Sequence, residues 1–104
     1  MTDIEKVELK RDIQTIADHY GENQFDKCQE ELLELNDAIE YYMTRIVLGK
    51  PTLNAMGHVN EEIADVEIMT AQLKLLLHSE DEVNKIKRFK VDRQLKRIEK
   101  EDAE

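Results

Sequence analysis

Apolar residues recur at alternating intervals of three and four along the first half of the chain, and this spacing constrains the fold most. An α-helix has 3.6 residues per turn, so residues spaced in this way line up as a seam that packs against other helices. The seam comprises Phe25, Cys28, Leu32, Leu35, Ile39, Tyr42 and Ile46. It predicts a long helix from about residue 24 or 26 to residue 47, ended by Gly49 with Pro51 just after it.

Helical spacing predicts three further helices, whose starts carry capping residues. Thr2 with Glu5, and Ser79 with Glu82, have the spacing of a capping box, and Asn60 is a favourable N-cap. Gly21 can end the first helix. The predicted helices therefore cover residues 3–20, about 24–47, 60–78 and 80–99, with one long connection over residues 49–59.

The composition supports an all-α helical bundle in a single domain. Only three of the 104 residues are Gly and one is Pro, too few to separate the many short strands of an all-β fold. We expect one domain over residues 1–100 and a frayed acidic tail over residues 101–104. A chain of this length buries only about 60–65% of its unfolded surface, so a monomer is marginally stable.

Nothing in the sequence indicates secretion or membrane insertion. No apolar run approaches the ~18 residues that span a membrane, and the N-terminus lacks the basic start of a signal peptide. Cys28, the only cysteine, cannot form an internal disulfide. We therefore expect a cytoplasmic protein with no membrane partner.

The net charge of −9 conceals two opposite surfaces. Residues 1–84 carry 19 acids and 7 bases, whereas residues 85–100 carry 2 acids and 8 bases. The excess of acid argues against nucleic acid as a partner, because attraction to phosphate requires a basic surface.

The helix predicted over residues 60–78 is apolar on two sides. Its main stripe comprises Val66, Met69, Leu73, Leu76 and Leu77. Ile68 and Leu75 lie on another side, and a helix of this kind is usually covered from two directions. We expect another subunit to provide the second cover, in a homodimer or homotetramer.

Carboxylates lie close to these apolar stripes. On the second predicted helix, Glu31 lies about 60° and Glu34 about 120° from the seam, whereas Glu30 points about 160° away from it. On the third, Glu62 lies about 10–20° from the middle of the stripe and Asp65 one residue-step to the side. A carboxylate facing the core loses solvation worth several kcal/mol unless protonation, a basic side chain or a metal ion neutralises it.

Four such carboxylates favour a hard divalent cation. Glu31, Glu34, Glu62 and Asp65 offer only oxygen ligands, which suit Mg²⁺, or Mn²⁺ as the alternative, and suit zinc or iron poorly. Mg²⁺ in turn indicates a phosphorylated substrate that completes its coordination shell. The competing interpretation is a solvated acidic face, because acid pairs three residues apart are ordinary in a chain with 24 acids.

This pattern resembles the signature of a known enzyme family. Glu30-Glu31-Leu32-Leu33-Glu34, followed by Glu62-Ile63-Ala64-Asp65, is similar to the EExxE…ExxD motif of the MazG-like all-α nucleoside triphosphate pyrophosphohydrolases. The resemblance covers about residues 20–80, and the helix order and short length agree with it. It implies hydrolysis of an NTP or dNTP to the monophosphate and pyrophosphate.

The resemblance also implies roles for single residues. By motif position, Glu31, Glu34, Glu62 and Asp65 would bind Mg²⁺. Glu34 or Glu31 would position or deprotonate the attacking water, and Glu30 would orient the site. A phosphoribosyl-ATP pyrophosphohydrolase, which has a similar motif, is the alternative within the same enzyme class.

The basic segment supplies candidates for substrate binding. Lys85, Arg88 and Arg93 carry charges that would neutralise a triphosphate, within one chain or across a subunit boundary, and Gln24 offers a polar contact to a base. The competing interpretation is that the cations only solvate an exposed helix and balance acids elsewhere.

A non-enzymatic helical module that binds a protein partner is the alternative from a different class. The position of Glu62 distinguishes the two, because a pure interaction module gains nothing from an acid on a buried stripe.

Overall fold

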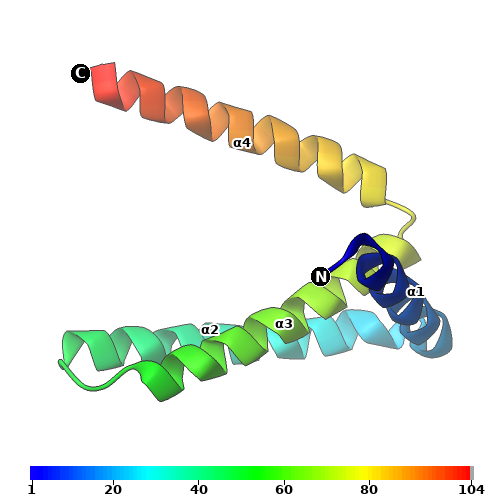
Figure 1. Cartoon of the computed structure of the whole chain (residues 1–104), viewed down its shortest axis with the longest axis horizontal. Coiled ribbons are helices and arrows are strands. Elements are labelled where there is room, and N and C mark those ends of the chain that lie inside the picture. Colours follow the sequence, from blue (N-terminus) through cyan, green and yellow to red (C-terminus); the bar gives the residue numbers. More distant parts are fainter. Residues whose placement is uncertain (104) are drawn as a thin grey trace.

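The chain folds into four helices. The computed structural model describes residues 1–103, and within this range it contains no strand. The helices are α1 (Asp3–Tyr20), α2 (Asn23–Val47), α3 (Leu53–Leu76) and α4 (Glu80–Ala103). Figure 1 shows α2 and α3 side by side as a hairpin, with α1 at one end of it and α4 leading away from that end. The predicted all-α class is confirmed.

The predicted ends of α1 form as expected. The Thr2 hydroxyl accepts a hydrogen bond from the Glu5 backbone N–H at 3.1 Å, and the Glu5 carboxylate accepts one from the Thr2 N–H at 3.5 Å. At the other end, Gly21 has a φ of +58° and its N–H donates to the Ala17 carbonyl at 2.8 Å. Local residues therefore provide hydrogen-bond partners for backbone groups at both ends of α1.

The predicted start of α3 at Asn60 is wrong. The helix begins at Leu53, seven residues earlier, and includes most of the segment that we expected to be a connection. Ala55 is buried and Val59 half-buried, so these residues extend the stripe of α3 that faces α2. Packing of this stripe outweighs the helix-breaking tendency of Gly57, which costs only about 1 kcal/mol.

The core between α2 and α3 is thin and is built mainly from small side chains. The buried apolar residues are Ile13, Ala17, Cys28, Ala38, Ala55 and Met69. Small residues let two helices approach closely, but they bury little apolar surface. The radius of gyration is 17.4 Å, whereas a compact chain of this length has about 13 Å. A single chain therefore encloses little of its own apolar surface.

Three of the seven positions of the seam predicted on α2 face solvent. Cys28 is buried, and Phe25, Leu35 and Tyr42 are half-buried. The remaining seam positions, at residues 32, 39 and 46, are exposed. On α3, Ile68 is exposed and Leu75 is half-buried beside Leu9 and Ile13, so α1 provides part of the cover that we expected from another subunit.

Helix α4 is an extended arm. It runs to Ala103, past the end expected at about Glu99, so residues 101–103 of the expected tail are helical, and Glu104 lies outside the described residues. None of its described residues is buried. Among the other helices only α3 has backbone close to α4. Over residues 1–103, no helix has both the length and the apolar character that crossing a bilayer requires.

The early start of α3 predicts opposite effects for two glycine substitutions. Gly57 lies within the helix with free space where a Cβ would stand, so Gly57→Ala is expected to stabilise the fold by about 0.5–1 kcal/mol. Gly49 has a φ of +66°, and Gly49→Ala is expected to destabilise it by about 1–2 kcal/mol. Urea unfolding followed by circular dichroism measures both. A destabilising Gly57→Ala would contradict a helical start at Leu53.

Candidate functional site

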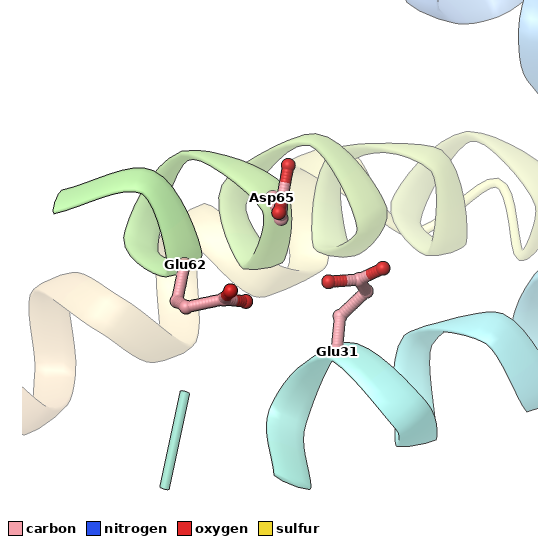
Figure 2. A group of neighbouring side chains, drawn as sticks. All are labelled: Glu31, Glu62 and Asp65. Atoms are coloured by element: carbon pink, nitrogen blue, oxygen red, sulfur yellow. The ribbon is translucent and has the colours of Figure 1, made fainter. Parts of the chain in front are cut away.

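Three carboxylates meet between α2 and α3. Glu31 comes from α2, and Glu62 and Asp65 come from α3 (Figure 2). One carboxylate oxygen from each lies within 4.8 Å of the other two. The side chains of Glu31 and Glu62 point toward one another across the gap between the helices. The structure thus brings together three of the four predicted metal ligands.

The local sequence explains this convergence. Residues three apart on a helix share a face, which places Glu62 and Asp65 together. Glu31 lies three residues after buried Cys28, so it shares the side of α2 that faces α3. The pairing of the two helices therefore brings Glu31 to the pair on α3.

The cluster contains two buried oxygens that lack partners. Glu31 and Glu62 are each only 8% exposed. The Oε2 atom of each is buried and accepts no hydrogen bond. An unpaired buried charge is costly, so each oxygen is a candidate ligand atom for a cation.

The other oxygens of these two carboxylates have basic neighbours. Lys27 Nζ lies 3.2 Å from Glu31 Oε1, and His58 Nδ1 lies 4.0 Å from Glu62 Oε1. The hydrogen bond to Glu31 and the charge of that carboxylate raise the pKa of Lys27. Both basic residues stand one helical turn before the acid that they approach, and both are half exposed.

Glu34, the fourth predicted ligand, is outside the three-residue cluster but electrostatically coupled to it. The charge of Glu31 is the main cause of a raised pKa at Glu34, and the charge of Glu62 adds to the effect. Glu34 is exposed, so it lies at the solvent side of the cluster. Its coupling to Glu31 shows that a cation bound between them would be attracted by both.

The remaining predicted residues lie away from the three-residue cluster. Glu30 is exposed, as its outward angle predicted, and its Oε2 lies 3.5 Å from Lys27 Nζ. Gln24 is buried, and its amide donates to Gln72 Oε1 at 2.7 Å. The structure therefore gives Gln24 a packing contact between α2 and α3.

The structure does not join the cations of α4 to the carboxylates within one chain. Lys85, Arg88 and Arg93 are all exposed, and Arg88 pairs with Asp92 of its own helix at 2.8 Å. Across residues 1–103, no hydrogen bond or ion pair links these three residues to the cluster.

Sequence reasoning did not assign Lys27 and His58 to the site. Both stand four residues before an acid of the cluster, a spacing that is visible in the sequence. The connection predicted over residues 49–59 includes His58, because the predicted start of α3 is seven residues too late. With the helix starting at Leu53, the same spacing places His58 beside Glu62.

The donor set fits a hard divalent cation. It consists of carboxylate oxygens only, two of them buried and without partners. The thiol of Cys28 is buried nearby, and burial raises its pKa, which keeps it protonated and a poor ligand or nucleophile. The chemistry that this arrangement supports is binding of Mg²⁺ or Mn²⁺.

Comparison with known proteins adds no family assignment. No protein-family model matches the sequence, and no curated protein or solved structure is similar to it.

The unpartnered oxygens of Glu31 and Glu62 predict that a divalent metal ion stabilises the fold. Mg²⁺ or Mn²⁺ at one hundred times its dissociation constant stabilises the fold by about 2.7 kcal/mol, which corresponds to several degrees in Tm. Thermal melting with and without each ion, followed by addition of EDTA, measures this shift. Without metal, Glu62→Gln is expected to melt at or above the wild-type temperature, because it removes a buried unpaired charge.

Glu61→Gln is the matched control, since Glu61 is the exposed neighbour of Glu62 and lies outside the cluster. It should keep the metal-induced shift, and Glu62→Gln should lose it. Equal shifts in both variants would show that the ions act elsewhere on this acidic chain.

Proposed function

We propose that the protein is a Mg²⁺-dependent nucleoside triphosphate pyrophosphohydrolase that converts an NTP or dNTP to the monophosphate and pyrophosphate. The observation that carries this proposal is the pair of buried, unpartnered oxygens on Glu31 and Glu62, beside Asp65. These residues match the motif that resembles the MazG-like family. A carboxylate cluster without nitrogen or sulfur ligands suits the ion that accompanies nucleotide phosphates.

The four motif carboxylates would hold the metal. Glu31, Glu62 and Asp65 already converge, and Glu34 lies at the solvent side of Glu31. When bound, Mg²⁺ would contribute charge neutralisation at the phosphate oxygens. A cation there also offsets the mutual repulsion of the acids.

Glu34 is the better placed of the two candidate bases. It is exposed, so water reaches it. In the proposed step, the water oxygen bonds to phosphorus, the bond to the departing pyrophosphate breaks, and the proton passes to the carboxylate. Glu31 is the alternative base, and Glu30 would orient the site from its solvent side.

Cations from α4 would neutralise the triphosphate. Lys85, Arg88 and Arg93 are exposed, but Arg88 pairs with Asp92 and α4 leads away from the carboxylates of its own chain. They would therefore act on the site of another subunit in a homodimer or homotetramer, or after a movement of α4. Gln24 would contact the base only by giving up its hydrogen bond to Gln72.

The burial of Glu62 favours an enzyme over a helical interaction module. A protein-binding module requires an apolar or charged outer face, and it gains no affinity from a desolvated acid between its own helices. The phosphoribosyl-ATP pyrophosphohydrolase alternative uses the same carboxylates and differs only in the nucleotide. A cytoplasmic location, as expected from the sequence, would suit nucleotide substrates of either kind.

Pyrophosphate release tests the proposed reaction. We expect turnover of at least one nucleotide in a screen of NTPs, dNTPs and phosphoribosyl-ATP with Mg²⁺ or Mn²⁺. Glu62→Gln should reduce turnover to background with an unchanged helical circular dichroism spectrum, whereas Glu61→Gln should remain active. No turnover of any nucleotide would contradict the enzyme, and activity in Glu62→Gln would contradict the site.

The role of the α4 cations predicts a selective effect on substrate affinity. Replacing Lys85, Arg88 and Arg93 with Gln should raise KM for the triphosphate by about tenfold or more, because each lost phosphate contact removes about 0.5–1.5 kcal/mol. The control replaces Lys87, Lys90 and Arg97, three other cations of α4, with Gln. Equal KM values in both triple variants would show that only the net charge of α4 matters.

A further inference from the structure

The α2–α3 hairpin has an apolar face on the side opposite the carboxylates. Its exposed apolar residues are Leu32, Ile39, Met43 and Ile46 of α2, with Met56 and Ile63 of α3. Glu34 follows Leu32 by two residues and Asp65 follows Ile63 by two, which is about 200° around each helix. Because the carboxylates of both helices meet on one side, the two apolar stripes share the other side. We call this set of six residues the hairpin face.

Helix α4 carries apolar stripes that contact nothing in its own chain. Val91, Leu95 and Ile98 recur at i, i+4 and i+7 along one side and are 43–51% exposed. Ile86 and Phe89 lie nearly opposite, and Phe89 is 66% exposed. Figure 1 shows α4 diverging from the hairpin along its whole length. Such a helix is stable in water only when something covers it.

The exposed surface is large enough to form a stable interface. The chain has 8455 Å² of accessible surface, whereas a compact monomer of 12.2 kDa exposes about 6,100 Å². The excess, about 2,400 Å², is well above the roughly 800 Å² that each partner buries in a standard interface.

The charges indicate which surfaces meet. Helices α2 and α3 carry ten acids and three bases, a net charge of −7, and residues 85–100 of α4 carry two acids and eight bases, a net charge of +6. Two hairpin faces placed together would bring like charges together, and so would two α4 helices. An α4 helix on a hairpin face buries apolar residues on both and brings together helices of opposite net charge.

We propose that two copies of this chain exchange their α4 arms, so that α4 of each copy packs on the hairpin face of the other. The 24 residues of α4 match the 25 of α2 in length, so one arm covers the stripe from Leu32 to Ile46. Its second stripe, with Ile86 and Phe89, then faces the other arm or the edge of the interface.

The evidence for the arm exchange is the exposed apolar surface and the charge of the helices. The proposal therefore does not depend on nucleotide hydrolysis. It specifies the interface within the homo-oligomer of the proposed function. The arm docks on the side of the hairpin opposite the carboxylates, so the acidic side stays open to solvent and to a metal. The α4 cations would then reach a carboxylate site only in a further subunit of a tetramer or after a movement of α4.

Point variants on α4 test the exchange without truncation. Light scattering after size exclusion should give twice the mass of one chain for the wild type. Leu95→Glu with Ile98→Glu should raise the dimer dissociation constant by about a hundredfold or more, because charges would be buried unpaired. The charge-matched control is Lys96→Gln with Lys100→Gln, at neighbouring positions on the other side of α4. It should stay dimeric, and equal weakening would overturn the proposal.

A cross-linking experiment identifies the surfaces that meet. Isotope-labelled and unlabelled full-length chains are refolded together and treated with a carbodiimide, which joins lysine amines to carboxylates. Mass spectrometry should find mixed-isotope links between residues 85–100 and acids of α2 or α3, such as Glu40 and Glu67. The result should be the same for Glu62→Gln, whether or not that variant or the wild type hydrolyses any nucleotide.

Other outcomes would overturn the arm exchange. A wild-type chain that stays monomeric throughout the micromolar range, with links only within one chain, would show that α4 folds back on its own hairpin. A dimer whose mixed-isotope links join α4 to α4, or hairpin to hairpin, would place the interface elsewhere.

Discussion

The pair of buried carboxylates between α2 and α3 is the constraint on which the rest of the structure depends. Glu31 and Glu62 share a water-poor gap, and each leaves one oxygen without a partner. The repulsion between them acts directly against the pairing of the two helices that form the core. The neighbouring contacts that hold the helices together include a hydrogen bond between Gln24 and buried Gln72. Lys27 offsets part of the negative charge from the solvent side. A cation between the helices would replace the repulsion between Glu31 and Glu62 with metal coordination that joins α2 to α3.

The close approach that brings the carboxylates together also leaves the chain with little core. Cys28, Ala38 and Ala55 let α2 and α3 come near each other, and larger side chains there would separate Glu31 from the acids of α3. The consequence is that the large apolar residues of α2 lie on its outer side, where one chain does not cover them. A narrow interface that holds three carboxylates and an apolar outer face are therefore two results of one packing arrangement. This explains why a chain with a well-defined site is far from compact.

Features fixed by local chemistry could be predicted from the sequence, and features fixed by distant contacts could not. The capping box at Thr2 and the turn at Gly21 depend on residues three or four positions away, and both formed as predicted. The convergence of Glu62 and Asp65 with Glu31 followed from helical angles. The start of α3 could not be predicted, because Ala55 and Val59 become helical through contact with α2 despite Gly57.

The course of α4 was equally hidden from the sequence. Its apolar stripe changes sides between Phe89 and Val91, so periodicity alone gives no single packing face. Its direction follows from the short connection before it, where His78 has a φ of +52° that is rare for a residue with a side chain.

The proposed metal site and the proposed dimer interface use opposite sides of the same helix. On α2, a step of two residues from Leu32 to Glu34 moves from the apolar face to the acidic side. The charge that serves the site also shapes the assembly, because a hairpin with a net charge of −7 repels a second hairpin and attracts a cationic helix. A metal bound on the acidic side would weaken that repulsion without touching the apolar face. Metal loading and the choice of partner surface are therefore linked through the net charge of the hairpin, which acts over about a Debye length of 8–10 Å.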